Sequence, residues 1–397
     1  MKHIPGKVPL GQITQWLSGG TPSRSVEEYW DGEIPWISAS TLKNTEVSSS
    51  DQCVTQEAVR QGSKMAPINS TLLLVRGSAL HNEIRAGIVR APVCFNQDVK
   101  ALVPCKSIYP KFLTYSILGR ENDLLKLVSS AGNTAGVLDT KLVQGFEIWL
   151  PEYNEQRAIA SALSDVDALI KNLDRLIAKK RDIKQAAMQE LLTGKTRLPG
   201  FSDEWEEKRF DELISHRRDR INPSRSAPQN FCIELEDLSQ GTGRLLSWSS
   251  TTSRSSLKSI FSTGDVLFGK LRAYLRKYWL ANQAGVCSTE IWVFSPTHKI
   301  ISSYLYHLIT TDLFLEAAST SYGTHMPRSD WNVIKELRII LPSLPEQTAI
   351  ASVLSDMDAE IEELEKRRAK TANLKQGMMQ ELLTGRTRLV QPEIPHV

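Results

Sequence analysis

Two stretches of the chain carry apolar residues spaced alternately three and four positions apart. The first stretch lies between Glu155 and Thr193 and contains neither proline nor glycine, and the second lies between Glu346 and Thr384 and contains only Gly377. A narrow apolar stripe with charged flanks is typical of a helix in a coiled coil. The predicted coiled-coil seam consists of Ile159, Leu163, Val166, Ile170, Leu173 and Ile177 in the first helix and Ile350, Leu354, Met357, Ile361 and Leu364 in the second.

Both predicted helices have matching start and stop signals. Each begins with Glu-Gln, which favours the positive end of the helix dipole, and Pro345 suits a first helical turn. Each reaches a glycine, Gly194 or Gly385, in the place of a C-terminal stop. At 1.5 Å per residue, some 40 residues give a helix of about 60 Å.

The two helices belong to an internal repeat. Residues 150–198 align with residues 341–389 without a gap, and about 29 of 49 positions are identical. The string Gly194-Lys-Thr in the first copy is not a phosphate-binding loop, because Gln189 stands where that loop needs a glycine and Arg386 replaces Lys195 in the second copy. Duplication therefore explains the repeated phrase MQELLTG(K/R)TRL.

The repeat divides the chain into four parts. We predict globular modules at 1–149 and 199–340, a central helix at 150–198, and a C-terminal helix and tail at 341–397. Both modules mix short β-rich runs with helix-like stretches, which predicts α/β (α+β) folds. The strands are expected at 32–37, 71–75, 265–268 and 290–294, and the helices at 110–128 and 302–318. The modules resemble each other weakly until their last strand, where residues 146–150 match 337–341.

Two similar apolar seams in one chain would most simply cover each other. An antiparallel coiled coil would give the chain pseudo-two-fold symmetry and would send the two modules to opposite ends. Such a molecule would hold its modules a fixed distance apart. The alternative is that each helix merely packs on its own module.

The amino-acid composition excludes some classes of protein but does not indicate a function. The chain has 397 residues, a net charge of +3, and hydrophobic and charged contents of 41% and 23%, which are ordinary for a soluble globular protein. The N-terminus lacks an apolar signal region and no run is long enough to cross a bilayer, so we expect no membrane contact. Five dispersed cysteines fit reduced thiols in the cytoplasm and argue against a zinc or disulfide framework.

Basic residues cluster at 216–220 (HRRDR) and at 269–279 (GKLRAYLRKYW), where they are either solvated or bind phosphates. In the second cluster we expect a strand or hairpin with Lys270, Arg272, Tyr274 and Arg276 on one face, followed by Lys277. Arg76, Ser78 and Arg85 occupy a roughly corresponding place in the first module. The polar loops before the shared last strand add the candidate DNA-binding residues Asn133, Thr134, Tyr322, Thr324, His325 and Arg328.

Motifs for catalysis are missing. The nearest approach to the Asn-Pro-Pro-Tyr box of amino-methyltransferases is Asn222-Pro-Ser, which lacks the second proline and the aromatic residue. Gly241-Thr-Gly243 has no third glycine, and the seven histidines include no H-x-x-x-H or H-E-x-x-H pair. We therefore expect no catalytic residue, no bound cofactor and no metal site.

Several phrases together resemble the DNA-specificity subunit of type I restriction–modification systems. They are the P-x-x-x-E-Q-x-A-I-A opening of the repeat, its L-S-D-x-D-A segment and its Q-E-L-L-T-G-(K/R)-T-R-L ending. The opening Gly19-Gly-Thr-Pro-Ser-Arg24 also looks like the start of that family's recognition domains, which adds Thr21, Ser23 and Arg24 as DNA-binding candidates. The second module lacks this opening, so its loops cannot be assigned from the first.

This resemblance implies a non-catalytic subunit that binds double-stranded DNA, each module reading one half of an asymmetric, bipartite site. It implies that the helices set the unread spacer and dock two methyltransferase subunits, with endonuclease/translocase subunits completing the complex. S-adenosylmethionine, ATP and Mg²⁺ are then expected on these partners. Two alternatives remain: a coiled-coil adapter or regulatory paralogue that binds the methyltransferase without reading DNA, and a nuclease or methyltransferase in its own right.

Overall fold

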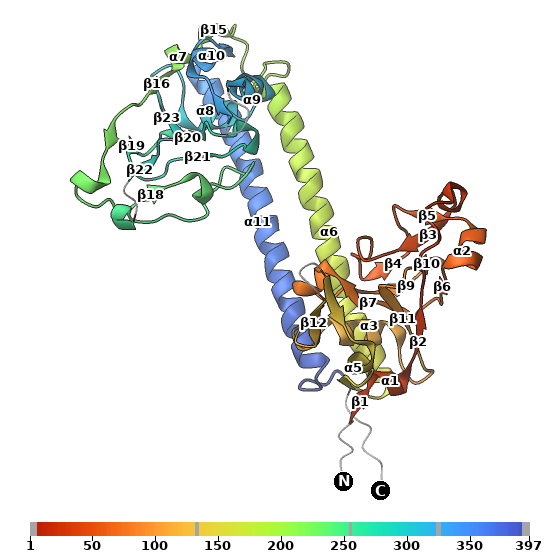
Figure 1. Cartoon of the computed structure of the whole chain (residues 1–397). Helices are drawn as coiled ribbons and strands as arrows, with labels where there is room; N and C mark the ends of the chain where they lie inside the picture. Colours follow the sequence, from red (N-terminus) through yellow and green to blue (C-terminus); the bar gives the residue numbers. More distant parts are fainter. Residues whose placement is uncertain (1–5, 132–134, 254–255, 323–326, 391–397) are drawn as a thin grey trace. The chain divides into compact units, whose positions relative to one another are not determined.

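The computed structural model describes the chain except for residues 1–5, 132–134, 254–255, 323–326 and 391–397. The chain forms two compact units, one made of Met1–Asp174 with Arg367–Val397 and the other of Arg175–Lys366. The two long helices are α6, Tyr153–Leu191, and α11, Leu344–Leu382, and each contributes to both units (Figure 1). Among the described residues, no helix is both long and apolar enough to span a bilayer.

In the first unit, two mixed sheets and a small three-stranded sheet form the module. The five-stranded sheet has the order β2 (Thr14–Ser18), β11 (Val99–Pro104), β7 (Thr71–Leu74), β9 (Ala86–Val89), β4 (Glu46–Val47). The four-stranded sheet has the order β5 (Cys53–Val54), β3 (Ile34–Ile37), β10 (Val93–Phe95), β6 (Met65–Ala66). The remaining strands are β12 (Val128–Ala131), β13 (Ala135–Leu138) and β8 (Arg76–Gly77) in one sheet, and β1 (Lys7–Pro9) with β14 (Glu147–Trp149) in another.

Short helices connect these strands. They are α1 (Leu10–Ile13), α2 (Gln56–Gly62), α3 (Pro110–Leu118), α4 (Glu121–Leu125) and α5 (Thr140–Gln144), with 3-10 turns η1 (Glu27–Trp30) and η2 (Ser78–His81). The helix predicted over 110–128 is thus two helices, since the chain leaves the helical path at Gly119 and Arg120. Thr114 of α3 hydrogen-bonds to Thr71 of the five-stranded sheet at 2.8 Å, so α3 lies on that sheet.

The second unit contains two four-stranded sheets. Their orders are β16 (Ile214–His216), β23 (Ile291–Pro296), β20 (Val266–Gly269), β21 (Tyr278–Leu280), and β17 (Arg220–Ile221), β19 (Lys258–Phe261), β22 (Gly285–Ser288), β18 (Cys232–Ile233). Two smaller pairs are β15 (Glu206–Arg209) with β26 (Arg338–Leu341), and β24 (Ser321–Tyr322) with β25 (Arg328–Ser329). The helices are α7 (Phe210–Leu213), α8 (Ser302–Leu308), α9 (Asp312–Ser319) and α10 (Trp331–Lys335), with 3-10 turns η3 (Pro223–Arg225), η4 (Leu235–Asp237), η5 (Thr251–Ser253) and η6 (Ala273–Leu275).

The two modules share a strand topology, although their sequences resemble each other only weakly. The antiparallel order β2-β11-β7-β9 in the first corresponds to β16-β23-β20-β21 in the second. The four-stranded sheet of the first module has a parallel pair, β3 with β10, and the second sheet of the second module has one too, β18 with β22. The last strand of each module, β14 or β26, pairs with its first strand, β1 or β15. These two last strands are the segments whose sequences match, and both lead directly into a long helix.

Within each unit the two long helices run antiparallel. In the first unit Asp167 pairs with Lys375 at 2.6 Å and Asp174 with Arg368 at 3.0 Å. The later residue of α6 thus pairs with the earlier residue of α11, as in antiparallel helices. In the second unit Lys184 pairs with Asp358 at 2.5 Å. Asp358 and Lys375 are the repeat equivalents of Asp167 and Lys184, so one ion pair occurs twice. The predicted α/β modules, antiparallel coiled coil and pseudo-two-fold repeat are confirmed.

The helices also pack on their own modules. Ile159 and Leu163 of α6 belong to the apolar core of the first module, and Ile350 and Leu354 of α11 belong to that of the second. Every predicted seam position is buried or half-buried. Each helix therefore packs both on its own module and on the partner helix. The seam residues near the start of each helix face the module, and those further along face the partner helix.

Two equivalent Arg–Glu ion pairs, called clasps below, join the two copies of the repeat. The Nε atom of Arg388 donates to both oxygens of Glu155 at 2.6 Å, and Arg197 donates from Nε and Nη2 to Glu346, also at 2.6 Å. Each arginine comes from the ending of one copy, and each glutamate from the opening of the other. Both glutamate side chains are at most 2% exposed. Each arginine also lies over an indole, at 5.5 Å from the ring of Trp149 or Trp205.

Replacing Arg388 with alanine should destabilise the first unit by about 3 kcal/mol, because removing one partner of a buried ion pair leaves an uncompensated charge. Chemical denaturation of the full chain measures this loss. A second variant that combines Arg388→Ala with Glu155→Gln should lose clearly less stability, since no buried charge is left unpaired. Equal losses in the two variants would show that the clasp acts through packing on Trp149 instead of charge.

Candidate nucleic-acid interface

The opening of the first module is held tightly against its four-stranded sheet. A Cβ atom on Gly19 would lie 2.0 Å from the carbonyl oxygen of Phe95, so only glycine fits there. The Thr21 hydroxyl donates to Gln97 at 2.7 Å, and the Arg24 guanidinium lies 3.4 Å from the centre of the Trp30 ring. The candidate residues Thr21, Ser23 and Arg24 are all exposed. The segment is therefore an ordered, solvent-facing loop whose path is fixed by its two glycines.

Both modules carry a β-hairpin beside the basic candidates. In the first module β12 and β13 form the hairpin, and β13 pairs with β8 through Val137 and Arg76. In the second module β24 and β25 form it, and Arg328 of β25 bridges to Leu271. The sequence places both segments before the shared last strand of a module, and the sheets likewise place the two hairpins in equivalent positions. The residue two positions after the end of β7 or β20 makes the equivalent contact in each module, because Arg76 pairs with Val137 and Leu271 bridges to Arg328.

Several candidate residues fall in or next to these strands along the chain. Asn133, Thr134, Thr324 and His325 lie outside the described residues, and Tyr322 is described only as part of the backbone of β24. Ser78 is exposed at the start of η2, directly after β8. The structure thus gathers Arg76, Ser78 and the strands that flank the 132–134 tip at one small sheet.

Of the strand or hairpin predicted here, the structure shows a hairpin, formed by β20 and β21, but residues 270–276 do not form a strand with alternating side chains. The chain leaves β20 at Gly269, makes the 3-10 turn η6 at Ala273–Leu275 and returns as β21. Arg272 and Arg276 flank this turn with φ angles of 53° and 50°, in the left-handed region. The alternation rule therefore fails, since it holds only for extended backbone. Non-glycine residues in this region are uncommon and strained, and such strain is often found at functional sites.

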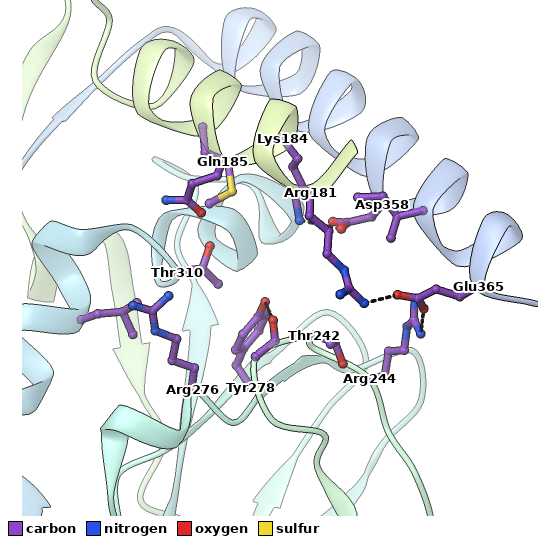
Figure 2. Close-up of a pocket in the computed structure, with 14 residues that line it drawn as sticks. Arg181, Lys184, Gln185, Thr242, Arg244, Arg276, Tyr278, Thr310, Asp358 and Glu365 are labelled. Carbon is purple, nitrogen blue, oxygen red and sulfur yellow. Dashed lines mark hydrogen bonds and ion pairs between the residues drawn. The ribbon is translucent and has the colours of Figure 1, made fainter. Parts of the chain in front are cut away.

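This turn sends the basic side chains in different directions. Arg276 lines a cavity of about 200 Å³ beside the long helices, which also contains Arg244 and Glu365 (Figure 2). Lys270 lines a different cavity on the module. Arg272 and Tyr274 are exposed, with Tyr274 at 60%. Of the four residues expected on one face, Arg272, Tyr274 and Arg276 are exposed, with Arg276 also lining the first cavity, and Lys270 is half-buried.

Three candidates are engaged by their own module. The Lys277 ammonium donates to the carbonyl oxygen of Leu235 at 2.5 Å. Arg328 pairs with Glu290 at 2.9 Å, and Arg85 donates to Glu83 and to the carbonyl oxygen of Ala39. Sequence pattern could not separate these structural arginines and lysines from free ones, because the pattern does not show which oxygen atoms the fold brings to each cation.

The second module is fixed to the long helices by charge. Glu365 of α11 accepts from Arg244 of the module and from Arg181 of α6, both at 2.5 Å (Figure 2). In the first unit the corresponding attachment uses a hydroxyl, since Tyr115 of α3 donates to Asp167 of α6 at 2.7 Å. Each module is thus anchored to its helices by polar contacts in addition to its apolar core.

Taken together, two topologically equivalent mixed modules with exposed cationic turns and hairpins, each fused to an antiparallel helix pair, define a tandem recognition protein. The model of the type I restriction modification DNA specificity domain matches residues 6–179 and residues 202–374. The chain therefore belongs to the type I restriction–modification DNA specificity family, which confirms the resemblance drawn from the sequence motifs.

Known relatives agree with this assignment. The chain is 34% identical over 178 residues to the Escherichia coli type I restriction enzyme EcoR124I/EcoR124II specificity subunit, a match that covers 44% of each protein. It is 23% identical to the MjaVIII specificity subunit of Methanocaldococcus jannaschii, over 96% of this chain and 92% of that protein.

Solved structures with the same fold include the type I restriction–modification S subunit from M. genitalium, with a TM-score of 0.59 and 13% identity over 96% of this chain and 97% of that one. A second is a chain from a study of complex assembly and conformational transition of the type I R-M system, with a TM-score of 0.60 and 16% identity over 96% of this chain and 98% of that one.

Proposed function

We propose that this chain selects the DNA site of a type I restriction–modification complex, with each module reading one half of an asymmetric, two-part sequence. The observation that carries the proposal is the contrast between the modules. They share a strand order and differ in their surface loops, while the helix repeat keeps about 29 of 49 positions identical. Modules that bind different sequences need different side chains on the same set of strands, whereas two equivalent docking sites need similar helices.

The two copies of the helix repeat support docking of two methyltransferase subunits, one on each equivalent surface. Endonuclease/translocase subunits would join them. The chain itself contributes binding and no catalytic group, and S-adenosylmethionine, ATP and Mg²⁺ would be held by the partners. Membership of a DNA specificity family supports this proposal over an adapter that does not read DNA.

Modified-base sequencing of a genome that carries this chain and its methyltransferase tests the proposal. We expect methylated adenine in a single two-part motif whose halves are separated by a spacer of constant length. Deleting this chain while retaining the methyltransferase should abolish that motif. Persistence of the motif without the chain would refute the proposal.

The turn at Arg272 allows a sharper test of the second module. Replacing Arg272 with glycine removes the guanidinium and tolerates the left-handed backbone, whereas alanine does not. If Arg272 contacts a base, the glycine variant should lose roughly 1–3 kcal/mol of binding to duplexes that keep this half-site intact, and little on duplexes in which the contacted base pair is already changed. Competition binding with duplexes that vary in one half at a time measures this loss. An equal loss on all sequences would identify a phosphate contact.

A further inference from the structure

A cationic cavity of about 250 Å³ lies on the second module, apart from the turn at Arg272. Segments from six elements or their ends surround it: β16, β17, β19, the residue after β20, the start of β23, and the start of α10. Its polar lining includes His216, Arg218, Arg220, Ser259, Lys270 and Thr289. The HRRDR segment, whose role the sequence left open, thus lines the same cavity as Lys270, which lies about fifty residues later in the chain.

The charges around this cavity are unbalanced. Arg217 in the same run is neutralised, since it lies 3.3 Å from Asp265 and donates to Ser295. In contrast, no carboxylate of the described residues lies within 4.0 Å of the cationic groups of Arg218, Arg220 or Lys270. Three positive charges at one cavity repel each other, and an anion in the cavity would remove that repulsion.

Hydrogen-bonding groups at the cavity also lack partners. The Nδ1 atom of His216 is buried and makes no hydrogen bond within the described part of the chain. Burial first, and then the charges of Arg218, Lys270 and Arg220, lower the pKa of His216 to about 4, so its ring is neutral at pH 7. The ring packs on Trp331, with 4.4 Å between centroids. A buried polar atom without a protein partner is costly, and a hydrogen-bonding ligand that enters the cavity can supply one.

The position of Lys270 connects the cavity to the hairpin. The Lys270 carbonyl oxygen accepts the backbone N–H of Ser329 at 2.9 Å, at the end of β25. A ligand held at this cavity would therefore lie beside the β24–β25 hairpin, which is a candidate for base reading. Arg218 and Arg220 are exposed at the rim, where they can follow an extended anion out of the cavity.

We propose that this cavity binds a backbone phosphate of the DNA duplex beside the half-site read by the second module, with Arg218, Arg220 and Lys270 as the phosphate-binding cations. This inference rests on the proposed function, since it needs DNA on this module. Phosphate contacts fix the register and orientation of a protein on the duplex without reading sequence. The cavity would thus position the hairpin and the Arg272 turn over the base edges.

The test uses the full chain and measures duplex affinity between about 50 and 200 mM salt. It compares the wild type, Arg218→Gln/Arg220→Gln and the triple variant that adds Lys270→Gln. The slope of log affinity against log salt should fall by about 0.9 for each phosphate-binding cation removed, hence by about 1.8 and 2.7. Arg338→Gln is the matched control, because Arg338 is an exposed arginine of the same module paired with Glu207. Its slope should equal that of the wild type.

The outcomes separate the two proposals. A wild-type chain that binds no duplex, alone or with its methyltransferase, overturns the proposed function. Sequence-selective wild-type binding with an unchanged slope in the triple variant overturns only the phosphate site. Inorganic phosphate or ATP at millimolar concentration provides a further arm. If either raises the melting temperature of the wild type but not of the triple variant, while the DNA slope is unchanged, the cavity binds a free phosphoryl anion and the duplex assignment is wrong.

Discussion

Removing one heptad from each long helix, residues 167–173 together with 369–375, is expected to shorten the unread spacer by about three base pairs. Seven residues correspond to about 10.5 Å of helix, and base pairs are stacked at about 3.4 Å. The deletion keeps the seam in phase because the coiled-coil repeat is seven residues. It removes the Asp167–Lys375 pair but retains Asp174–Arg368 and the Glu155–Arg388 clasp.

Modified-base sequencing of cells that carry the shortened chain measures the spacer directly. Methylation at the original motif should disappear, and a motif with the same two halves and a shorter spacer should replace it. Deleting 167–173 alone is the control. It should lower stability instead of changing the spacer, because the ion pairs at Asp174 and Glu155 can no longer form together. An unchanged spacer in the matched deletion would show that the helices do not set it.

A chain that ends after Leu198 is expected to pair with a second copy of itself. This half contains Glu155 and Arg197, and the structure shows Arg388, the equivalent of Arg197, clasping Glu155. It also contains Asp167 and Lys184. In the full chain these residues pair with Lys375 and Asp358, which are the repeat equivalents of Lys184 and Asp167. Two copies can therefore form every clasp and ion pair of this type reciprocally, with Trp149 beneath each arginine.

Light scattering should give twice the mass of one half-chain, and genome sequencing with the methyltransferase should show a motif made of one half-site and its inverted copy. Arg197→Ala in the half-chain is the control and should shift the population toward monomer. A folded half-chain that stays monomeric at every concentration tested would contradict this prediction.

Local sequence patterns were sufficient for the helices. The heptad spacing from Ile159 to Ile177 and the glycines at 194 and 385 predicted two long helices, and the structure shows them as α6 and α11, each of which ends three residues before its glycine. Strands such as β7 were also predicted, because a short apolar run such as Thr71–Leu74 buried on both faces is recognisable by itself. The motifs of the repeat identified the family for the same reason, since they are contiguous in the chain.

The recognition surface depended on contacts between distant residues. The region from Lys270 to Lys277 looks like an alternating strand, but the hairpin between β20 and β21 needs a tight turn there. Whether an arginine is free or paired depended on carboxylates elsewhere, as with Arg328 and Glu290. No local pattern reports such pairing.

By itself, the sequence determined the duplicated helices, their seam, the order of modules and helices, and the family. The tertiary structure decided that the two unlike modules share one strand order, that each repeat ending clasps the opening of the other copy, and that HRRDR and Lys270 meet at one cavity. The physical reason is that helix formation and its apolar stripe are encoded within a few turns of chain. Sheet order, ion pairing and cavities instead depend on which distant segments are brought together by burial of the core.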